Sequence, residues 1–258
     1  MTSSKKFDIN LALELAHLSA ATYTQYVDYI KGKKWTVPEG YKLEITFQTT
    51  HEGDPYPLGF IASKGGDIYI SWRGVLTIEE WFEAIDFEQE DCAYLTEGSK
   101  VESGFYQVYT LAEKIFSPQV KVLNFLKERQ IKGNIYLTGH SLGGALAVLN
   151  ALDIVKHTEY QDLILYSFAA PRTGSPEYAA IYNNANLNSW RVVNVNDEVP
   201  KLPLKNTLGC YYQHVNQEFS ITFGSGCIED WAEDHLLPNY ISQLEKMKEG
   251  LCANTNEE

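Results

Sequence analysis

The sequence predicts an α/β protein with a central, mostly parallel sheet flanked by helices and with antiparallel strands at the edges. The first observation behind this prediction is that β-rich and helical segments alternate from residue 135 to residue 195. This rhythm favours parallel pairing in a sheet that helices cover. The second observation is a segment near 210–223 with the pattern of a β-hairpin, which is an antiparallel unit.

The expected elements follow in order along the chain. Leucines at helical spacing predict a first helix over residues 8–28. Alternating or β-rich segments predict strands over 41–49, 57–63 and 66–72. Apolar residues on one face predict helices over 77–87 and 104–130, with Pro118 as a possible break in the second. Strands are then expected over 135–138, 163–168 and 190–195, and helices over 141–156, 175–186 and 238–249.

The size and charge of the chain limit its class. Its 258 residues favour one large domain over the whole length, 1–258, and only the ends, 1–6 and 253–258, look frayed. Acidic residues outnumber basic ones by 34 to 21, which gives a net charge of −13. This balance argues against a nucleic-acid partner, which needs a basic surplus, and equally against electrostatic docking on anionic membranes.

The cysteines do not predict a metal site. Cys92, Cys210, Cys227 and Cys252 form no CxxC pair, and no histidine lies near them at ligand spacing. Four free thiols are the favoured interpretation, and a single bridge between Cys210 and Cys227 is the alternative.

The N-terminal residues contain two lysines before an apolar stretch, as a signal peptide does. Asp8, Glu14 and His17 interrupt that stretch, so we expect a soluble amphipathic helix and a cytoplasmic protein. Residues 133–152 carry no Asp, Glu, Lys or Arg, but their glycines and polar residues make them too broken for a transmembrane segment.

Residues 139–143 read Gly-His-Ser-Leu-Gly and match the pattern G-x-S-x-G. The pattern is weak alone, but here it follows an apolar strand and precedes a strong helix former, which is the setting of a nucleophile elbow. The helix N-terminus places positive partial charge near Ser141, which favours a developing oxyanion. A glycine-rich turn with a capping serine is the alternative.

A nucleophilic serine needs a base, and in many serine hydrolases a histidine follows it in the chain. Three histidines follow Ser141. His157 ends the same helix about four turns away, and His214 sits among alternating residues of the expected hairpin. His235 is expected in a loop just before the last helix, and a loop is where a catalytic base usually projects, so His235 is favoured.

The acid and the oxyanion donors are expected at strand ends. Asp197 directly follows the strand over 190–195 and is the favoured acid, with the adjacent Glu198 as its rival and an ordinary Asx turn as the alternative. One oxyanion N–H should come from Leu142, the residue after the nucleophile. The other should come from the loop after Trp72, where Gly74 allows a sharp turn.

These blocks together resemble the class 3 lipase family, the α/β-hydrolases that include fungal-type triacylglycerol lipases and related feruloyl esterases. The resemblance spans about residues 10 to 245. The acid and histidine blocks are its most specific parts, and their order matches that of the family. The similar blocks lie at 72–75, 104–106, 139–144, 167–174, 191–203 and 234–240.

The resemblance implies a serine carboxylester hydrolase, a lipase or esterase that cleaves acylglycerols or other carboxylic esters through an acyl-enzyme on Ser141. Asp197 would orient His235, and Val75 and Leu142 would supply the oxyanion N–H groups. The family usually has Ser or Thr where this chain has Val75, so one hydroxyl contact is missing. No cofactor and no metal is implied, and the substrate is an ester or lipid at a lipid–water interface. The alternatives are an acyltransferase with the same triad and a lipase-like lipid-binding module without turnover.

The family carries its lid after the oxyanion loop, here about residues 76–98. An apolar stripe with a strongly acidic opposite face over 77–91 predicts a lid that covers the site in water and meets substrate on opening. A fixed surface helix with a buried stripe is the alternative.

We expect the initial rate of ester hydrolysis to jump when the substrate passes from dissolved monomers to an emulsion, because a lid of this kind opens at a lipid surface. The measurement is the initial rate against substrate concentration across the solubility limit. A smooth hyperbola through that limit would support the fixed surface helix instead.

Overall fold

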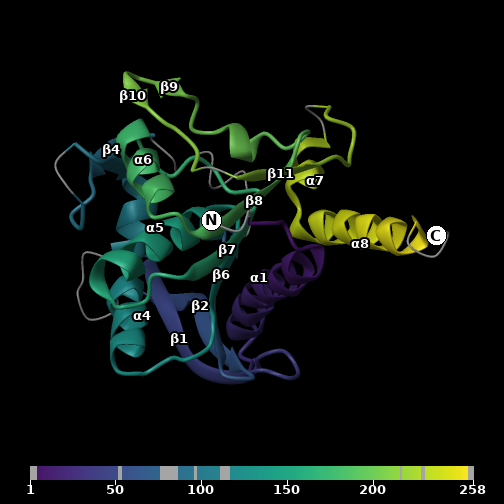
Figure 1. The fold of residues 1–258 in the computed structure, drawn as a ribbon, viewed down its shortest axis with the longest axis horizontal. Coiled ribbons are helices and arrows are strands. Elements are labelled where there is room, and N and C mark those ends of the chain that lie inside the picture. Colours follow the sequence, from purple (N-terminus) through teal and green to yellow (C-terminus); the bar gives the residue numbers. More distant parts are fainter. Residues whose placement is uncertain are drawn as a thin grey trace.

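Seven strands form the main sheet, in the spatial order β1-β2-β3-β6-β7-β8-β11 (Figure 1). The computed structural model describes residues 5–51, 54–75, 87–95, 98–110, 117–215, 217–227 and 230–254. The strands are β1 (Lys42–His51), β2 (Asp54–Lys64), β3 (Asp67–Trp72), β6 (Ile135–His140), β7 (Leu163–Phe168), β8 (Asn188–Asn194) and β11 (Glu218–Ile221).

Pairing within the sheet confirms the predicted fold class. β2 pairs antiparallel with both β1 and β3, and every pair from β3 to β11 is parallel. The inner parallel strands β6 and β7 are mostly buried, which is why they read as apolar runs. Since parallel strands share a direction, the carboxyl ends of β6, β7 and β8 meet at one edge of the sheet.

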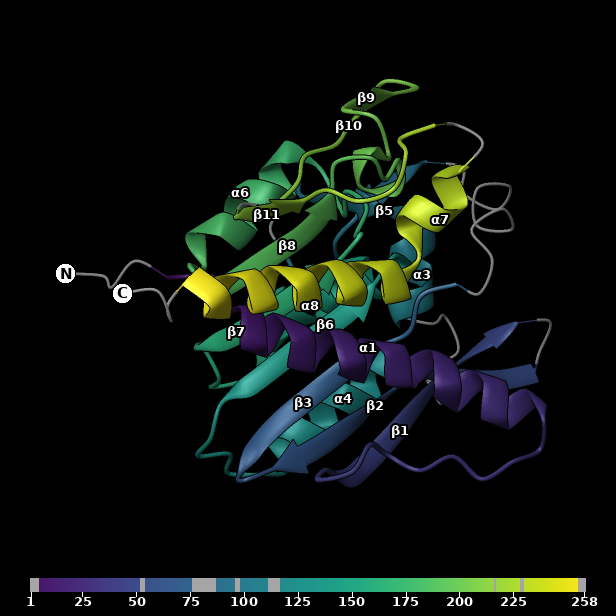
Figure 2. The same cartoon turned by 90° about the vertical axis from the view of Figure 1, so that its right-hand side faces the viewer.

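Helices cover both faces of the sheet, and each face has its own hydrophobic core. Helices α1 and α8 lie side by side over one face, and α3, α4, α5 and α6 lie over the other (Figures 1 and 2). Alternate residues of a strand serve the two cores: Tyr69 packs with α1 and α8, whereas Ile70 packs on the side of α5. The helices are α1 (Ile9–Ile30), α3 (Ser103–Thr110), α4 (Pro118–Lys127), α5 (Leu142–His157), α6 (Pro176–Asn184), α7 (Trp231–His235) and α8 (Leu237–Asn254).

One predicted break is confirmed and one predicted element is wrong. The expected helix over 104–130 is broken at Pro118, where Ser117 caps a new helix by accepting a hydrogen bond from the N–H of Val120. The expected hairpin near 210–223 is wrong. β11 instead pairs parallel with β8, and its Ile221 is buried in the core under α1 and α8.

The hairpin that exists lies slightly earlier in the chain. It joins β9 (Asn206–Thr207) to β10 (Cys210–Tyr211), and a second small sheet pairs β4 (Gln89–Asp91) with β5 (Lys100–Glu102). Cys210 and Cys227 are both free thiols.

Parts of the predicted lid segment lie outside the described residues. The expected helix over 77–87 falls on them except for Phe87, so it stays a prediction. None of the helices in the described part of the chain is both long and apolar enough to cross a bilayer. Because one sheet takes in strands from residue 42 to residue 221, we propose that residues 1–258 form a single domain.

The turn from β6 into α5 depends on a close backbone approach. A methyl group at Gly139 would lie 2.1 Å from the carbonyl oxygen of Gly143, far inside van der Waals contact. The oxygen belongs to backbone that α5 holds in place, and β6 holds the Cα atom from which the methyl group would project. The turn therefore admits only glycine at residue 139.

We expect Gly139→Ala to lower the free energy of unfolding by about 3 kcal/mol, the upper end of the usual range for overpacking. Gly250→Ala is the matched control, because nothing lies within 4 Å of a methyl group there and the residue is in α8. The control should raise stability by about 0.5–1 kcal/mol, since alanine is the better helix former. Urea unfolding measures both, and equal stability of Gly139→Ala and wild type would contradict the clash.

Candidate active site

Ser141 lies at the turn between β6 and α5 with φ 57° and ψ −130°, a strained conformation for a residue other than glycine. Its N–H donates to the carbonyl oxygen of Phe168 in β7 (2.9 Å), which holds the turn against the next strand. The residue is 1% exposed, and its Oγ has no hydrogen-bond partner among the described residues. A strained turn that presents an unengaged hydroxyl is the geometry of a nucleophile elbow.

Asp197 and His235 form a buried pair at the same edge of the sheet. His235 Nδ1 lies 2.8 Å from Asp197 Oδ2, and because the carboxylate only accepts, the ring nitrogen donates. The Tyr240 hydroxyl donates to the same Oδ2 (2.7 Å), and the Val199 N–H donates to Oδ1 (2.9 Å). The Nε2 atom of His235 is buried and has no partner in the described part of the chain, so it keeps a lone pair available.

The alternatives for base and acid have other partners. His214 Nε2 lies 2.6 Å from the carbonyl oxygen of Pro200, and the exposed Glu198 pairs with Lys201 at 2.6 Å. His157 contacts Asp153 (2.5 Å) at the far end of α5, roughly 24 Å along the helix from Ser141. His235 contacts the elbow itself, because its backbone oxygen bonds the ring of His140.

His140 links the elbow to the His235 segment. Its Nε2 lies 2.8 Å from the backbone oxygen of His235, and its Nδ1 lies 2.8 Å from the Tyr23 hydroxyl of α1. Since a carbonyl only accepts, Nε2 carries the proton and Nδ1 accepts from Tyr23. Burial, followed by the nearby His235, lowers the pKa of His140 well below its ordinary value, so the ring stays neutral. The two imidazole rings lie 4.6 Å apart, centre to centre, which places the His235 ring beside the elbow.

The predicted oxyanion loop runs across the elbow. A methyl group at Gly74 would lie 3.1 Å from Ser141 Cβ, so the backbone of Gly74 lies close to the turn that carries Ser141. Val75 directly follows Gly74, and Leu142 directly follows Ser141 as the first residue of α5. Arg73 holds this loop, because its Nε donates to the Pro57 carbonyl (2.9 Å) and its Nη1 to that of Gly74 (2.7 Å). Burial lowers the pKa of Arg73.

The structure corrects one detail and adds residues that the sequence did not single out. His235 is the last residue of the short helix α7, whereas a loop was expected. Tyr240, Tyr23 and Arg73 all support the site through hydrogen bonds, and none was predicted to do so. Tyr240 lies within the block that resembles the family's histidine segment, so that block held a signal for it.

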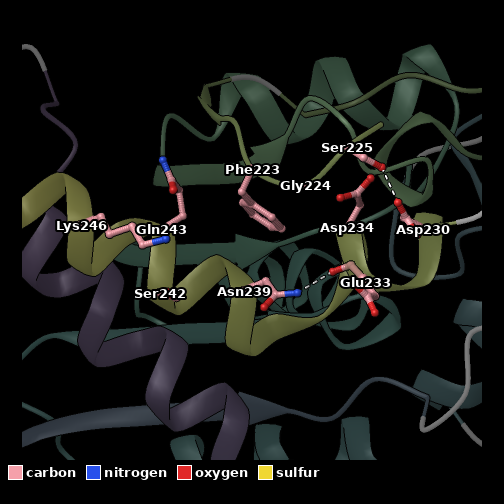
Figure 3. A pocket seen from close by; sticks show the side chains of 10 residues that line it. All are labelled: Phe223, Gly224, Ser225, Asp230, Glu233, Asp234, Asn239, Ser242, Gln243 and Lys246. Carbon is pink, nitrogen blue, oxygen red and sulfur yellow. Dashed lines mark hydrogen bonds between the residues drawn. The ribbon is translucent and has the colours of Figure 1, made fainter. Parts of the chain in front are cut away.

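A pocket lies beside α7, the helix that ends at His235 (Figure 3). Its lining includes Asp230, Glu233 and Asp234 but neither Ser141 nor His235. Asp234 accepts from the N–H of Gly226 (3.1 Å) with Oδ2, and its backbone oxygen accepts from the Asn194 side chain (3.0 Å). Asp234 therefore ties α7 to β8 and to the loop after β11.

Within the described ranges, no three His, Cys, Asp or Glu side chains are grouped to hold a metal ion.

The fold and the site define an α/β-hydrolase with a buried aspartate–histidine pair beside a nucleophile elbow, and known proteins share this architecture. The family model Lipase (class 3) matches residues 69–207. The secreted mono- and diacylglycerol lipase A of Penicillium cyclopium is 32% identical over 224 residues, which cover 84% of this chain and 70% of that protein. One solved structure is that of a triacylglycerol lipase whose catalytic centre is formed by a serine protease triad. It has a TM-score of 0.68 and 28% sequence identity, and the match covers 85% of this chain and 82% of that lipase. The chain belongs to the class 3 lipase family, and the predicted family is thereby confirmed.

Plant relatives are longer than this chain, and one of them is named as chloroplastic. Phospholipase A1-Igamma3, chloroplastic, of Arabidopsis thaliana is 33% identical over 162 residues, which cover 53% of this chain and 30% of that protein. The chain spans 39% or less of the first curated plant phospholipases A1 that it matches.

The expectation of a cytoplasmic protein is wrong, because the Penicillium relative is a secreted lipase and the Arabidopsis relative is chloroplastic. The residues behind that expectation form α1, whose apolar face packs on the sheet. Their pattern reflects packing and carries no information about the compartment.

His214 predicts a pH dependence of stability. Burial, followed by the nearby Arg191, lowers its pKa to about 3, whereas an unfolded histidine titrates near 6.5. Between these values the unfolded chain binds a proton that the folded chain does not, so stability falls as the pH falls below about 6.5.

We expect wild type to lose roughly 2 kcal/mol more unfolding free energy between pH 7 and pH 4.5 than His214→Gln, which keeps a donor for the Pro200 carbonyl. Urea unfolding at both pH values measures the difference. His17→Gln, the same change at an exposed histidine, is the control and should lose as much as wild type. Equal losses in wild type and His214→Gln would mean that His214 protonates freely in the folded state.

Proposed function

We propose that this protein is a serine carboxylester hydrolase of the lipase type that cleaves acyl esters of glycerol-based lipids. The nucleophile is Ser141, the base is His235 and the acid is Asp197. The observation that supports this proposal most is that Ser141 Oγ and His235 Nε2 lie at one edge of the sheet, and neither atom has a hydrogen-bond partner among the described residues. The Nδ1 atom of the same ring is hydrogen-bonded to Asp197. The Penicillium relative is a mono- and diacylglycerol lipase and the solved neighbour is a triacylglycerol lipase, which supports the substrate class.

The first half of the reaction forms an acyl-enzyme. His235 Nε2 takes the proton of Ser141 Oγ, and Oγ attacks the ester carbonyl to give a tetrahedral intermediate. The N–H groups of Val75 and Leu142 stabilise its negative oxygen. The carbon–oxygen bond to the alcohol then breaks, and His235 returns the proton to the leaving alkoxide.

The second half repeats the steps with water. His235 takes a proton from water, and the hydroxide attacks the acyl-enzyme. The carbon–oxygen bond to Ser141 then breaks, His235 returns the proton to Ser141 Oγ, and the carboxylic acid leaves. Asp197 holds the imidazole with its proton on Nδ1 and stabilises the charged ring in both halves. His140 supports the same arrangement from the other side, because it holds the backbone oxygen of His235 and stays neutral.

Val75 sets an expectation for the oxyanion site. Its backbone N–H serves as a donor whatever its side chain, so the loop keeps two N–H groups with Leu142. The hydroxyl that Ser or Thr would add is absent at residue 75. Thr77 could substitute for it in part, and it lies outside the described residues.

We expect Asp197→Asn to lower kcat by about 10⁴-fold with its fold intact, because the amide no longer favours the productive tautomer of His235. Ser141→Ala should lower kcat by about 10⁶-fold. The measurement is initial rates on p-nitrophenyl butyrate and p-nitrophenyl palmitate, with circular dichroism to check folding.

Glu198→Gln is the matched control, because Glu198 is the adjacent carboxylate and is exposed in its pair with Lys201. Its kcat should equal that of wild type. Normal turnover by Asp197→Asn would move the acid to another carboxylate, and turnover that survives Ser141→Ala would refute the proposed nucleophile. A folded wild type without activity on either ester would favour the lipid-binding module.

A further inference from the structure

The hairpin of β9 and β10 carries a leucine that the fold does not require. Its two-residue turn is Leu208–Gly209, with φ values of 51° and 85°. Turns with positive φ at both central residues favour Asn-Gly, because a bulky side chain is strained in this region. Leu208 is also 89% exposed, the highest value among the large apolar residues that are exposed in the described chain. Backbone geometry and solvation both argue against leucine here, so its presence calls for a contact outside the fold.

Further apolar side chains share the hairpin. Leu204 and Tyr211, on either side of the turn, are each 59% exposed. Figure 2 shows the hairpin at the top of the view, projecting beyond the sheet and its helices. A protruding apolar tip of this kind can enter another phase without displacing any element of the fold.

The charge around the hairpin is opposite to that of the chain. Residues 199–217 contain no Asp or Glu, in a protein that has 34 of them and a net charge of −13. Lys205 is exposed and has no ion-pair partner in the part of the chain that is described. The net charge, which argued against anionic surfaces, therefore does not describe this segment.

The hairpin is also joined to the active-site edge. The Tyr212 hydroxyl, just after β10, donates to the backbone oxygens of Phe87 (2.8 Å) and Glu88 (3.0 Å), and the Gln89 side chain donates to the Tyr211 carbonyl (2.7 Å). Residues 87–89 belong to the segment predicted to carry the lid. On its other side, the hairpin continues from the segment of Asp197 through Val199–Lys201.

We propose that the β9–β10 hairpin, residues 204–211, docks this protein on a lipid–water interface that carries fatty-acid carboxylates, with Leu208 entering the apolar layer and Lys205 facing the charged groups. This inference rests on the proposed function, because ester hydrolysis is what would load the interface with fatty acid. An apolar tip and an isolated cation match such a surface. The hairpin would hold the active-site edge against its substrate.

The test is co-sedimentation with phosphatidylcholine vesicles with and without oleic acid, using Ser141→Ala as the reference so that no lipid is consumed. We expect Leu208→Asn in that background to bind about tenfold more weakly, because a leucine side chain is no longer buried in the lipid. Asparagine suits the turn better than leucine, so thermal stability should hold or rise. Lys205→Gln should bind about fivefold more weakly, and only to vesicles that contain oleate.

Leu251→Asn is the matched control, because the same residue type is 58% exposed near the C-terminal end of α8, away from the hairpin. It should bind like the reference. Equal binding by Leu208→Asn and the reference would overturn the inference, and so would a reference protein that sediments with neither vesicle.

A soluble substrate separates this inference from the proposed function. With Ser141 intact, Leu208→Asn should hydrolyse dissolved p-nitrophenyl butyrate at the wild-type rate. If wild type hydrolyses that ester while Leu208→Asn loses no vesicle binding, the hairpin inference fails and the proposed function stands. If Ser141→Ala keeps the esterase activity, the proposed function fails whatever the vesicles show.

Discussion

The buried carboxylate of Asp197 is the constraint on which the rest of the site depends. A charged group with no exposure costs several kcal/mol unless hydrogen bonds replace its water. Three donors replace it here, one each from His235 at the end of α7, Tyr240 in α8 and Val199 after β8. Satisfying one charge therefore fixes three segments relative to one another. The imidazole orientation is a consequence of that arrangement.

A second chain of hydrogen bonds fixes His235, the proposed base, against the turn that carries Ser141. It runs from Tyr23 in α1 through His140, at the end of β6, to the backbone oxygen of His235. Each link has one possible direction, since the carbonyl can only accept, so the His140 tautomer is fixed without any charge. Helix α1 comes first in the chain, yet it contributes to a site whose other parts follow residue 70.

The sequence predicts well what is local and poorly what depends on pairing at a distance. The strand–turn–helix around Ser141 is readable because its glycines and its two flanking elements are contiguous. β11 was misassigned because four residues pair with β8 some 27 positions earlier, and nothing in their own alternation distinguishes parallel from antiparallel partners. Arg73 escaped prediction for a related reason, since the backbone carbonyls of Pro57 and Gly74 accept its hydrogen bonds and carry no sequence signature. Tyr23 escaped it because its partner, the His140 ring, lies 117 positions later in the chain. The roles of Ser141, Asp197 and His235 follow from residue order and stay proposals that kinetics must test.

The site keeps two polar atoms buried without a partner among the described residues, Ser141 Oγ and His235 Nε2. Each costs about 1–3 kcal/mol relative to a satisfied group. A fold without this function would gain stability by pairing or removing them, and it would also relax the strained φ of Ser141. The two hydrophobic cores, one on each face of the sheet, offset this cost and keep the turn rigid. Because the cores lie beneath the strands and the unpaired atoms lie beyond the strand ends, stability and reactivity are supplied by different parts of the same sheet.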